Sequence, residues 1–366
     1  MKKYSIFLLL IILQLSGCKF MKKNVPLTLL VGTYTDSTDQ GISVYHFDEN
    51  NLEYTLMSTT PVVNPSYLTL SADNKWVYAI SEQDSANAKV ISYSFDLYKG
   101  SLKQVDSKST YGSYPCYINN DDTRIYIANY GGGSLCYYHK LSNGSIGELI
   151  DVIDFNESSA GIPAAHAHCV YFSPDSSQVF VNNLGQDRIH CFIRSKDTSE
   201  LHLISGNPAI ISLPIGSGPR HSVFSHNGNK MYLINEVSGI VDVFDYKNKK
   251  LSMVQSIASD SIGGHGSADI HISNDGRFLY TSNRLKADGI SIFKINDNDL
   301  ITKIGYQKTG IHPRSFVITP NDKYILVACR DDNKIEIYSR DSKTGLLKDT
   351  GKRIRLHKPV CLKWSY

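Results

Sequence analysis

Several residue types and motifs are scarce or absent in this chain, and each absence removes a class of function. The 366 residues include only 5 methionines and 2 tryptophans, and the formal net charge is only +3. Because no dense basic cluster accompanies that charge, the sequence gives no indication of nucleic-acid binding. The Gly-x-Ser-x-Gly turn of serine hydrolases is missing. The glycine-rich segment 129–134 lacks the lysine of a phosphate-binding loop.

Cysteine pairs with the spacing of a metal site are also missing. The chain has 7 cysteines, and none stands in a Cys-x-x-Cys pair, so a zinc site is not indicated. Buried cysteine behaves as a small hydrophobic residue, and we expect this role here. Disulfides are the alternative in an oxidising compartment. Five cysteines lie inside apolar runs: Cys116, Cys169, Cys191, Cys329 and Cys361.

A long hydrophobic run occurs only at the start of the chain. The apolar stretch 6–13 follows two lysines and is too short to cross a bilayer, which is typical of a signal peptide. The Leu-Ser-Gly-Cys that ends at Cys18 resembles a bacterial lipobox, in which the cysteine becomes the lipidated N-terminus. We therefore expect a signal peptide over 1–18, a short tether over 19–25 and one domain over 26–366. The expected location is the cell envelope, on the periplasmic side or at the outer membrane, and a misread signal would mean the cytoplasm.

The rest of the chain is rich in strand signals that repeat. There are 23 tyrosines, and "PSYLTLSADNKWVYAISE" (65–82) shares a hairpin pattern with "GPRHSVFSHNGNKMYLINE" (218–236). A spacing near 50 residues, built only of strands, indicates a β-propeller with one four-stranded blade per repeat. The residues that precede the hairpin turns mark the repeats: Ser71, Asn119, Ser173, Ser225, Ser273 and Thr319.

The two ends of the chain supply the remaining blade. One more step beyond Thr319 reaches the terminal "KPVCLKWSY", whereas "LTLLVGTYT" and "GISVYHFD" near the start have the pattern of second and third strands. We therefore predict an all-β, seven-bladed β-propeller with four antiparallel strands per blade. Its last blade is closed by strands from both termini.

The hairpin geometry places two columns of side chains on one face of the disc. The first strand lines the channel and runs antiparallel to the second, so the start of one and the end of the other share a face. The first column contains residues five before each turn marker, and the second contains residues eleven after it. The first column is Ser66, Tyr114, His168, Arg220, Ala268 and Arg314. The second column is Glu82, Tyr130, Leu184, Glu236, Arg284 and Arg330.

These columns predict an anion-binding catalytic mouth. Arginine forks match carboxylate or phosphate, and histidine with glutamate supplies general acid–base capacity. The glycines after Asn129 would let a substrate approach the backbone closely. The alternative is solvated charge in a wet channel. The candidate catalytic residues are Glu236, His168, Arg220 and Arg284; the candidate substrate-binding residues are His166, His221, His271, Arg314 and Asn129.

Several motifs carry a resemblance to a known family. "VGTYT", "NYGGGS", "HAH", "NLGQDR", "GPRH", "DGRFLYTSNR" and "HPRSF" together cover most of residues 27–340. With these motifs the chain resembles the seven-bladed β-propeller lactonases, which include propeller-type bacterial 6-phosphogluconolactonases and fungal carboxymuconate-lactonizing enzymes. The resemblance implies a site without metal or other cofactor, built from His166 or His168 with Arg220, Glu236 and Arg284.

The resulting hypothesis is hydrolysis of a sugar or acidic lactone. Glu236 or His168 acts as general base on water, and Arg220 stabilises the oxyanion together with His221 or Arg284. Arg284 or Arg314 instead holds a substrate carboxylate or phosphate.

Three alternatives stay open. One is a cycloisomerase that acts on muconate-like acids, and another is a non-catalytic propeller that binds glycans or proteins in the cell envelope. The third is a calcium-dependent site, which would need Glu82, Glu236 and Asp269 to cluster. If the chain is exported as expected, it does not meet the phosphogluconolactone of the cytosol, so the identity of its substrate stays open.

Overall fold

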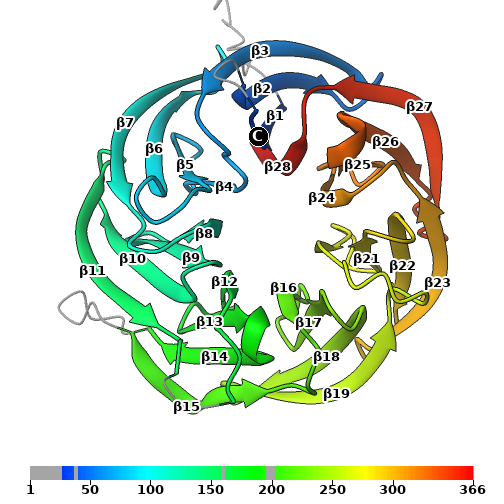
Figure 1. Cartoon of the computed structure of the whole chain (residues 1–366). Coiled ribbons are helices and arrows are strands. Elements are labelled where there is room, and N and C mark those ends of the chain that lie inside the picture. Colours follow the sequence, from blue (N-terminus) through cyan, green and yellow to red (C-terminus); the bar gives the residue numbers. More distant parts are fainter. Residues whose placement is uncertain (1–26, 37–39, 158–160, 195–202, 366) are drawn as a thin grey trace, which may run out of the picture.

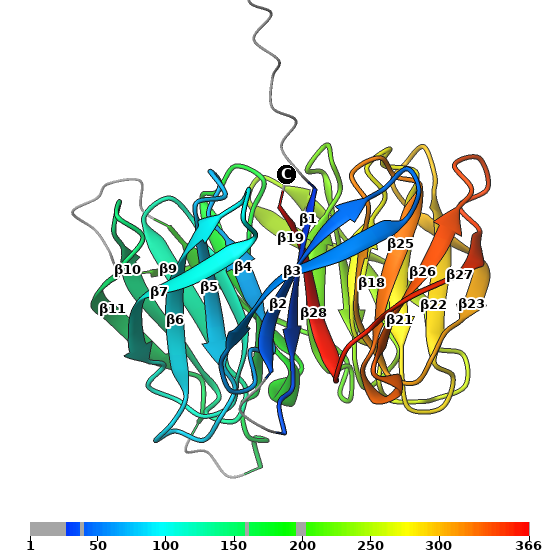
Figure 2. The ribbon, with the colours of Figure 1, turned by 90° about the horizontal axis from the view of Figure 1, so that it is seen from above.

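Seven four-stranded antiparallel sheets surround a central axis (Figure 1), as the repeat predicts. The computed structural model describes residues 27–36, 40–157, 161–194 and 203–365. Cys18 and the expected tether lie outside these residues. Seen at right angles, the strands run between the two faces of a disc (Figure 2). No helix among the described residues has the length and apolar character needed to cross a membrane.

The strands nearest the axis carry the candidate site, and those next to them are the best buried. Every residue of β9 and β21 is buried, because the blades on both sides cover the second strand. The innermost strands are β4 (Leu68–Leu70), β8 (Pro115–Asn120), β12 (Ala167–Phe172), β16 (Pro219–Phe224), β20 (Ile270–Ile272), β24 (Pro313–Ile318) and β28 (Pro359–Ser365). The second strands are β5 (Trp76–Ser81), β9 (Arg124–Asn129), β13 (Gln178–Asn183), β17 (Lys230–Asn235), β21 (Phe278–Asn283), β25 (Tyr324–Cys329) and β1 (Thr28–Thr33).

The outer half of each blade meets solvent. The third strands are β6 (Lys89–Asp96), β10 (Ser134–Lys140), β14 (Arg188–Ile193), β18 (Ile240–Lys247), β22 (Gly289–Ile295), β26 (Lys334–Arg340) and β2 (Gly41–Asp48). The fourth strands are β7 (Ser101–Ser109), β11 (Ile146–Asp154), β15 (Ile204–Ser212), β19 (Lys250–Ala258), β23 (Ile301–Lys308), β27 (Leu347–Arg355) and β3 (Glu53–Pro61). Two single-turn 3₁₀ helices, η1 (Leu184–Gln186) and η2 (Arg330–Asp332), follow β13 and β25.

Both ends of the chain build one blade, which confirms the predicted closure. The C-terminal strand β28 pairs antiparallel with β1, with Leu362 opposite Val31 and Lys363 opposite Leu30. Strand β1 pairs in turn with β2, and β2 with β3. The ring is thus held by main-chain hydrogen bonds between residues that are more than 300 positions apart in the sequence.

The turn markers organise the hairpins on the far face. The Ser173 hydroxyl donates to Asp175 (2.6 Å) and accepts from the Gln178 N–H (2.9 Å), so one side chain ties both ends of the turn. Such side-chain bonds are typical of Ser and Asp in turns. The same hydroxyl-to-backbone bond recurs in four other blades, at Ser71, Ser225, Ser273 and Thr319.

The hairpin of β8 and β9 differs, and one predicted column residue changes with it. Asn120 pairs with Ile125, five residues on, whereas Phe172 pairs with Val179, seven residues on. This turn is therefore two residues shorter, and its marker is Asp121, whose N–H bonds to the Arg124 carbonyl. The first-column residue of this blade is Cys116 and not the predicted Tyr114. The side chain of Tyr114 lies on the surface.

The core lies between neighbouring blades. Tyr126 and Leu135 of one blade pack with Val170 and Val181 of the next, and five similar clusters surround the axis. The predicted role of cysteine as core filling is confirmed, since six cysteines are buried and free. They are Cys116, Cys136, Cys169, Cys191, Cys329 and Cys361.

Candidate active site

A bulge repeated at the start of the inner strands directs the first column of side chains. In β16, Pro219 pairs with Asn235 and His221 with Ile234, so Arg220 has no partner across the hairpin. An extra residue of this kind bends the strand and redirects its side chain. The same register shift leaves one residue over in four other blades: Cys116, His168, Arg314 and Val360.

A repeated backbone hydrogen bond brings the second column to the same mouth. The Glu236 N–H donates to the Gly218 carbonyl, just before the bulge (2.7 Å), and the Tyr130 N–H donates to Tyr114 (3.0 Å). Equivalent bonds occur in the other five blades, so the predicted convergence of the two columns is confirmed. The donors there are Tyr34, Glu82, Leu184, Arg284 and Arg330.

Seven residues from both columns enclose a cavity of about 210 Å³ at this mouth. Carboxylates, a guanidinium, an imidazole and two phenols face one small space, which is the composition of a polar catalytic pocket. Its lining residues are Tyr34, Glu82, Cys116, Tyr130, His168, Glu236 and Arg314.

Two buried arginines hold Glu236 against the cavity. Arg220 Nε lies 2.7 Å from Oε2 of Glu236, and Arg284 Nη2 lies 3.1 Å from Oε1. Burial alone would raise the pKa of Glu236, but the charges of Arg284, Arg220 and Arg314 outweigh it and hold that pKa below its ordinary value. Glu236 is therefore an anion at neutral pH and a weak base. Neither Arg220 nor Arg284 lines the cavity, and their side chains are only 2% and 5% exposed, so they act behind Glu236.

His168 and His166 have different surroundings. Neither ring nitrogen of His168 has a hydrogen-bond partner among the described residues, and its Nδ1 is buried. Burial, followed by the charge of Arg220, lowers the pKa of His168 well below its ordinary value, so the imidazole is neutral. His166 does not line the cavity. Its Nδ1–H donates to the Tyr130 carbonyl (2.9 Å) and its ring stacks on Tyr130, with 4.5 Å between centroids.

A chain of polar groups extends from Arg220, and all of it is buried except His271, which is 34% exposed. His221 Nδ1–H donates to Asp269 Oδ1 (2.9 Å), which leaves its Nε2 to accept from Arg220 Nη1 (3.3 Å). Asp269 Oδ2 lies 3.2 Å from Nε2 of His271. Burial and the charge of Arg220 lower the pKa of His221 to about 4. Two predicted substrate-binding residues, His221 and His271, belong to this chain of polar groups and do not line the cavity.

Two tyrosine rings and a lysine lie next to His221. Tyr67 stacks on Tyr117 with 4.2 Å between ring centroids, and the His221 ring stands edge-on to both at 6.0 and 5.3 Å. Lys363 Nζ lies 4.5 Å from the Tyr67 centroid. Side chains from four blades therefore meet at this point.

Asn129 does not have the predicted substrate-binding role. Its side chain is fully buried and donates to the Thr110 carbonyl (2.9 Å) and to Ser134 Oγ (3.1 Å), which fixes the glycine turn between the strands. Neighbouring residues of a strand point to opposite sides, so Asn129 faces the blade because Tyr130 faces the cavity.

Four of the seven cavity residues were not among the predicted site residues: Glu82 and Tyr130 stood in the second column without an assigned role, and Tyr34 and Cys116 were in neither predicted column. Tyr34 occupies the second column of the closing blade, and its hydroxyl donates to both Glu82 carboxylate oxygens (3.1 and 3.0 Å). Burial, opposed by the charge of Arg314, raises the pKa of Tyr34 to about 12. Cys116 was missed because the short turn shifted its register. The signal that could have found it is a proline just before the bulge, which Pro115 shares with Pro219, Pro313 and Pro359.

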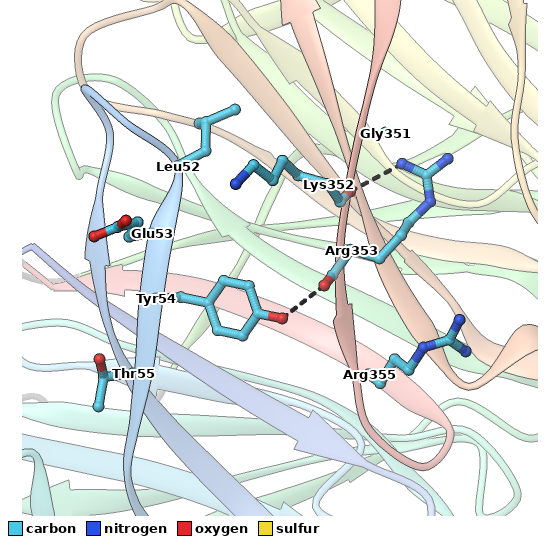
Figure 3. A pocket seen from close by; sticks show the side chains of 8 residues that line it. All are labelled: Leu52, Glu53, Tyr54, Thr55, Gly351, Lys352, Arg353 and Arg355. Atoms are coloured by element: carbon cyan, nitrogen blue, oxygen red, sulfur yellow. Dashed lines mark hydrogen bonds between the residues drawn. The ribbon is translucent and has the colours of Figure 1, made fainter.

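A larger cavity, of about 510 Å³, lies far from these residues on the outer wall between β3 and β27 (Figure 3). The Tyr54 hydroxyl bridges the two strands by donating to the Arg353 carbonyl (2.7 Å). Its lining contains no histidine or cysteine, so it offers no base comparable with His168. Within the described ranges, no three His, Cys, Asp or Glu side chains group so as to hold a metal ion.

Comparisons with known proteins agree with this architecture. The sequence model of the family described as "Lactonase, 7-bladed beta-propeller" matches residues 28–364. A 6-phosphogluconolactonase of Formosa agariphila is 35% identical over 332 residues, which cover 87% of this chain and 94% of that protein.

Solved structures show the same likeness in three dimensions. The periplasmic gluconolactonase of Pseudomonas aeruginosa is 28% identical with a TM-score of 0.87, over 93% of this chain and 99% of the other. A Bacteroides fragilis protein of known crystal structure is 43% identical to this chain, with a TM-score of 0.89, over 94% of this chain and 99% of the other.

Proposed function

This chain belongs to the 7-bladed β-propeller lactonase family and is a lactone-hydrolysing enzyme, and we propose that it opens a sugar or acidic lactone with water activated at His168. The observation that carries this proposal is the neutral, unpartnered imidazole that shares one small cavity with a carboxylate held by two arginines. The ring of His168 is neutral and has no hydrogen-bond partner among the described residues, so a nitrogen lone pair can accept a proton, whereas both oxygens of Glu236 are already held by Arg220 and Arg284.

The reaction then proceeds in two steps. Water attacks the lactone carbonyl as His168 takes its proton, and a carbon–oxygen bond forms. The imidazolium next gives that proton to the ring oxygen while the ring carbon–oxygen bond breaks, which leaves a hydroxy acid. Glu236 accepts a hydrogen bond from the attacking water and orients it.

Tyr130 is the proposed donor to the oxyanion. Its hydroxyl bonds to none of the described residues, and burial raises its pKa, so the phenol keeps its proton. Arg220 and Arg284 act through space, as fixed positive charges behind Glu236. This assignment replaces the direct oxyanion contact that the sequence predicted for Arg220.

A panel of lactones tests the proposed function. We expect purified protein to convert at least one sugar or acidic lactone to its hydroxy acid at a rate far above the spontaneous reaction. Acid release is followed by a pH-stat and the product is identified by mass spectrometry. Hydrolysis should be unchanged after dialysis against a chelator. A protein that accelerates ring opening of none of the neutral, carboxylated and phosphorylated lactones would contradict the proposal.

We also propose that the chain is exported and anchored by a lipid on Cys18, as its lipobox-like segment predicts. One acyl chain alone usually does not hold a protein stably on a membrane, and a second chain or another membrane-binding signal is needed. Bacterial lipoprotein processing attaches several chains. The full chain expressed in a bacterium should incorporate labelled palmitate and sediment with membranes. Cys18→Ala should lose both properties, and retention of the label in that variant would contradict the assignment.

A further inference from the structure

The lining of the 210 Å³ cavity divides into two halves around the axis. The blades follow one another around the ring in chain order (Figure 1), so the strand that carries a residue fixes its side of the cavity. The proposed chemistry uses residues from three consecutive blades, those of β9, β12 and β17: Tyr130, His168 and Glu236. The next three consecutive blades with lining residues, those of β24, β1 and β5, supply a group without an assigned role in the reaction: Arg314, Tyr34 and Glu82.

Glu82 has hydrogen-bond acceptors that the protein does not use. A carboxylate can accept about four hydrogen bonds. The Tyr34 hydroxyl supplies one proton, shared between Oε1 (3.1 Å) and Oε2 (3.0 Å), and no ion pair or further hydrogen bond from the described residues reaches that carboxylate. Glu236 differs, because Arg220 and Arg284 hold both of its oxygens. Glu82 therefore has acceptors left for a ligand in the cavity.

Arg314 has hydrogen-bond donors that the protein does not use. It makes no ion pair or hydrogen bond with any part of the chain that the structure describes, and its guanidinium lies 5.4 Å from the Tyr34 ring centroid. Although burial opposes it, the charges of Tyr34, Glu82 and Glu236 raise the pKa of Arg314, so it remains a cation. The same cavity thus offers a ligand unused donors beside unused acceptors.

Hydroxyl groups satisfy both kinds of partner at once. Each hydroxyl donates one hydrogen bond and accepts others, so it can donate to Glu82 while it accepts from Arg314. A lactone ring without hydroxyls would displace water from both side chains and leave them without partners, which costs free energy. A site built in this way rejects an analogue that lacks the hydroxyl.

The main chain and Tyr34 hold Glu82 in place for this contact. The Glu82 N–H donates to the Asn64 carbonyl (3.0 Å), and Asn64 Nδ2 donates to the Glu82 carbonyl (3.2 Å). Asn64 Oδ1 accepts from the N–H of Thr35, the residue after Tyr34 (2.8 Å). One asparagine thus joins the segment of Tyr34 to that of Glu82, and the Tyr34 hydroxyl then fixes the direction of the carboxylate.

We infer that Glu82 binds hydroxyl groups of the substrate and that Arg314 donates to their oxygens, so the site selects polyhydroxylated lactones over lactones without hydroxyls. Tyr34 is the positioning residue for Glu82. A phosphate elsewhere on the sugar leaves these hydroxyls in place, so the inference covers sugar lactones with and without phosphate. It rests on the proposed function and narrows its substrate class.

The test compares glucono-δ-lactone and 6-phosphoglucono-δ-lactone with δ-valerolactone, which has the same lactone ring without hydroxyls. Relative to spontaneous hydrolysis, kcat/KM for the better sugar lactone should exceed that for δ-valerolactone by at least about 100-fold. Glu82→Met removes the acceptors and should lower kcat/KM for that sugar lactone by about 10- to 100-fold, mainly through a higher KM. Glu82→Gln keeps one acceptor oxygen and should lose less. Tyr34→Phe and Arg314→Met should also raise KM.

Asp84→Asn is the matched control, because it removes a carboxylate two residues further along the chain, outside the cavity lining. It should leave KM for the sugar lactone unchanged. A wild-type protein that hydrolyses δ-valerolactone as well as the sugar lactones, or a Glu82→Met variant with an unchanged KM, would overturn the inference. So would conversion of other lactones but of neither sugar lactone. Failure with every lactone of the panel would instead count against the proposed function.

Discussion

Replacing His168 with asparagine should lower kcat by a factor of about 100 to 10,000, the range typical of a lost general base. The fold should survive, since the His168 ring makes no hydrogen bond that the substitution would break. Circular dichroism and thermal unfolding check the fold, and initial rates of acid release check the activity. His166→Asn is the control, and we expect it to cost less than tenfold because His166 lies outside the cavity lining.

The pH profile gives a second measure of the same role. A general base must be unprotonated, and burial places the pKa of His168 well below its ordinary value of 6.5. We therefore expect kcat/KM, corrected for spontaneous hydrolysis, to stay nearly constant from pH 7.5 down to about 6. An acid limb centred near 6.5, or full turnover by His168→Asn, would show that another group is the base.

Breaking the pair between Arg220 and Glu236 should remove both activity and stability. Arg220→Met leaves Glu236 with one of its two arginines and loses the Arg220 bond to the Ala268 carbonyl. Removing one partner of a buried ion pair typically costs about 3–5 kcal/mol of unfolding free energy. We expect that loss in urea unfolding, together with at least about a 100-fold lower kcat/KM, which is the scale of one lost electrostatic stabiliser.

A double variant separates the two effects. Glu236→Gln alone should also lower activity by about 100-fold or more, because the water loses an ionised acceptor. In Arg220→Met with Glu236→Gln no anion is left unpaired, so part of the stability should return while the activity stays low. If the double variant recovered activity together with stability, the pair of Arg220 and Glu236 would have a structural role only. Full turnover in both single variants would contradict the site assignment.

The sequence was sufficient for the fold because each blade repeats the same local chemistry. A turn hydroxyl such as that of Ser173 or Ser273 fixes the hairpin of its blade, and the regular spacing of these residues along the sequence gives the number of blades. The position of Arg220 and Glu236 on one face then follows from antiparallel pairing alone. Closure also follows, because a lone blade could not cover its apolar faces.

The details of the site depend on departures from that repeat. Counting from Asn119 selects Tyr114, because the sequence shows that this blade is about two residues short but not that the missing residues belong to the turn. Tyr34 was missed because the closing blade takes its strands from both ends of the chain and has no marker of its own. The substrate-binding role of Asn129 was predicted from its position beside Tyr130 and the glycine turn. A step of one residue along a strand, however, reverses the direction of a side chain.

The closing blade also determines when the active site can form while the chain is being synthesised. Tyr34 stands near the start of the sequence, but β1, which carries it to the cavity, lies between β2 and β28 (Pro359–Ser365), which is made more than 300 residues later. Until β28 has been synthesised and has paired with β1, the ring stays open beside six complete blades. We therefore expect a polypeptide cut just before β28 to lack the closed cavity, although it holds nearly all of the site residues.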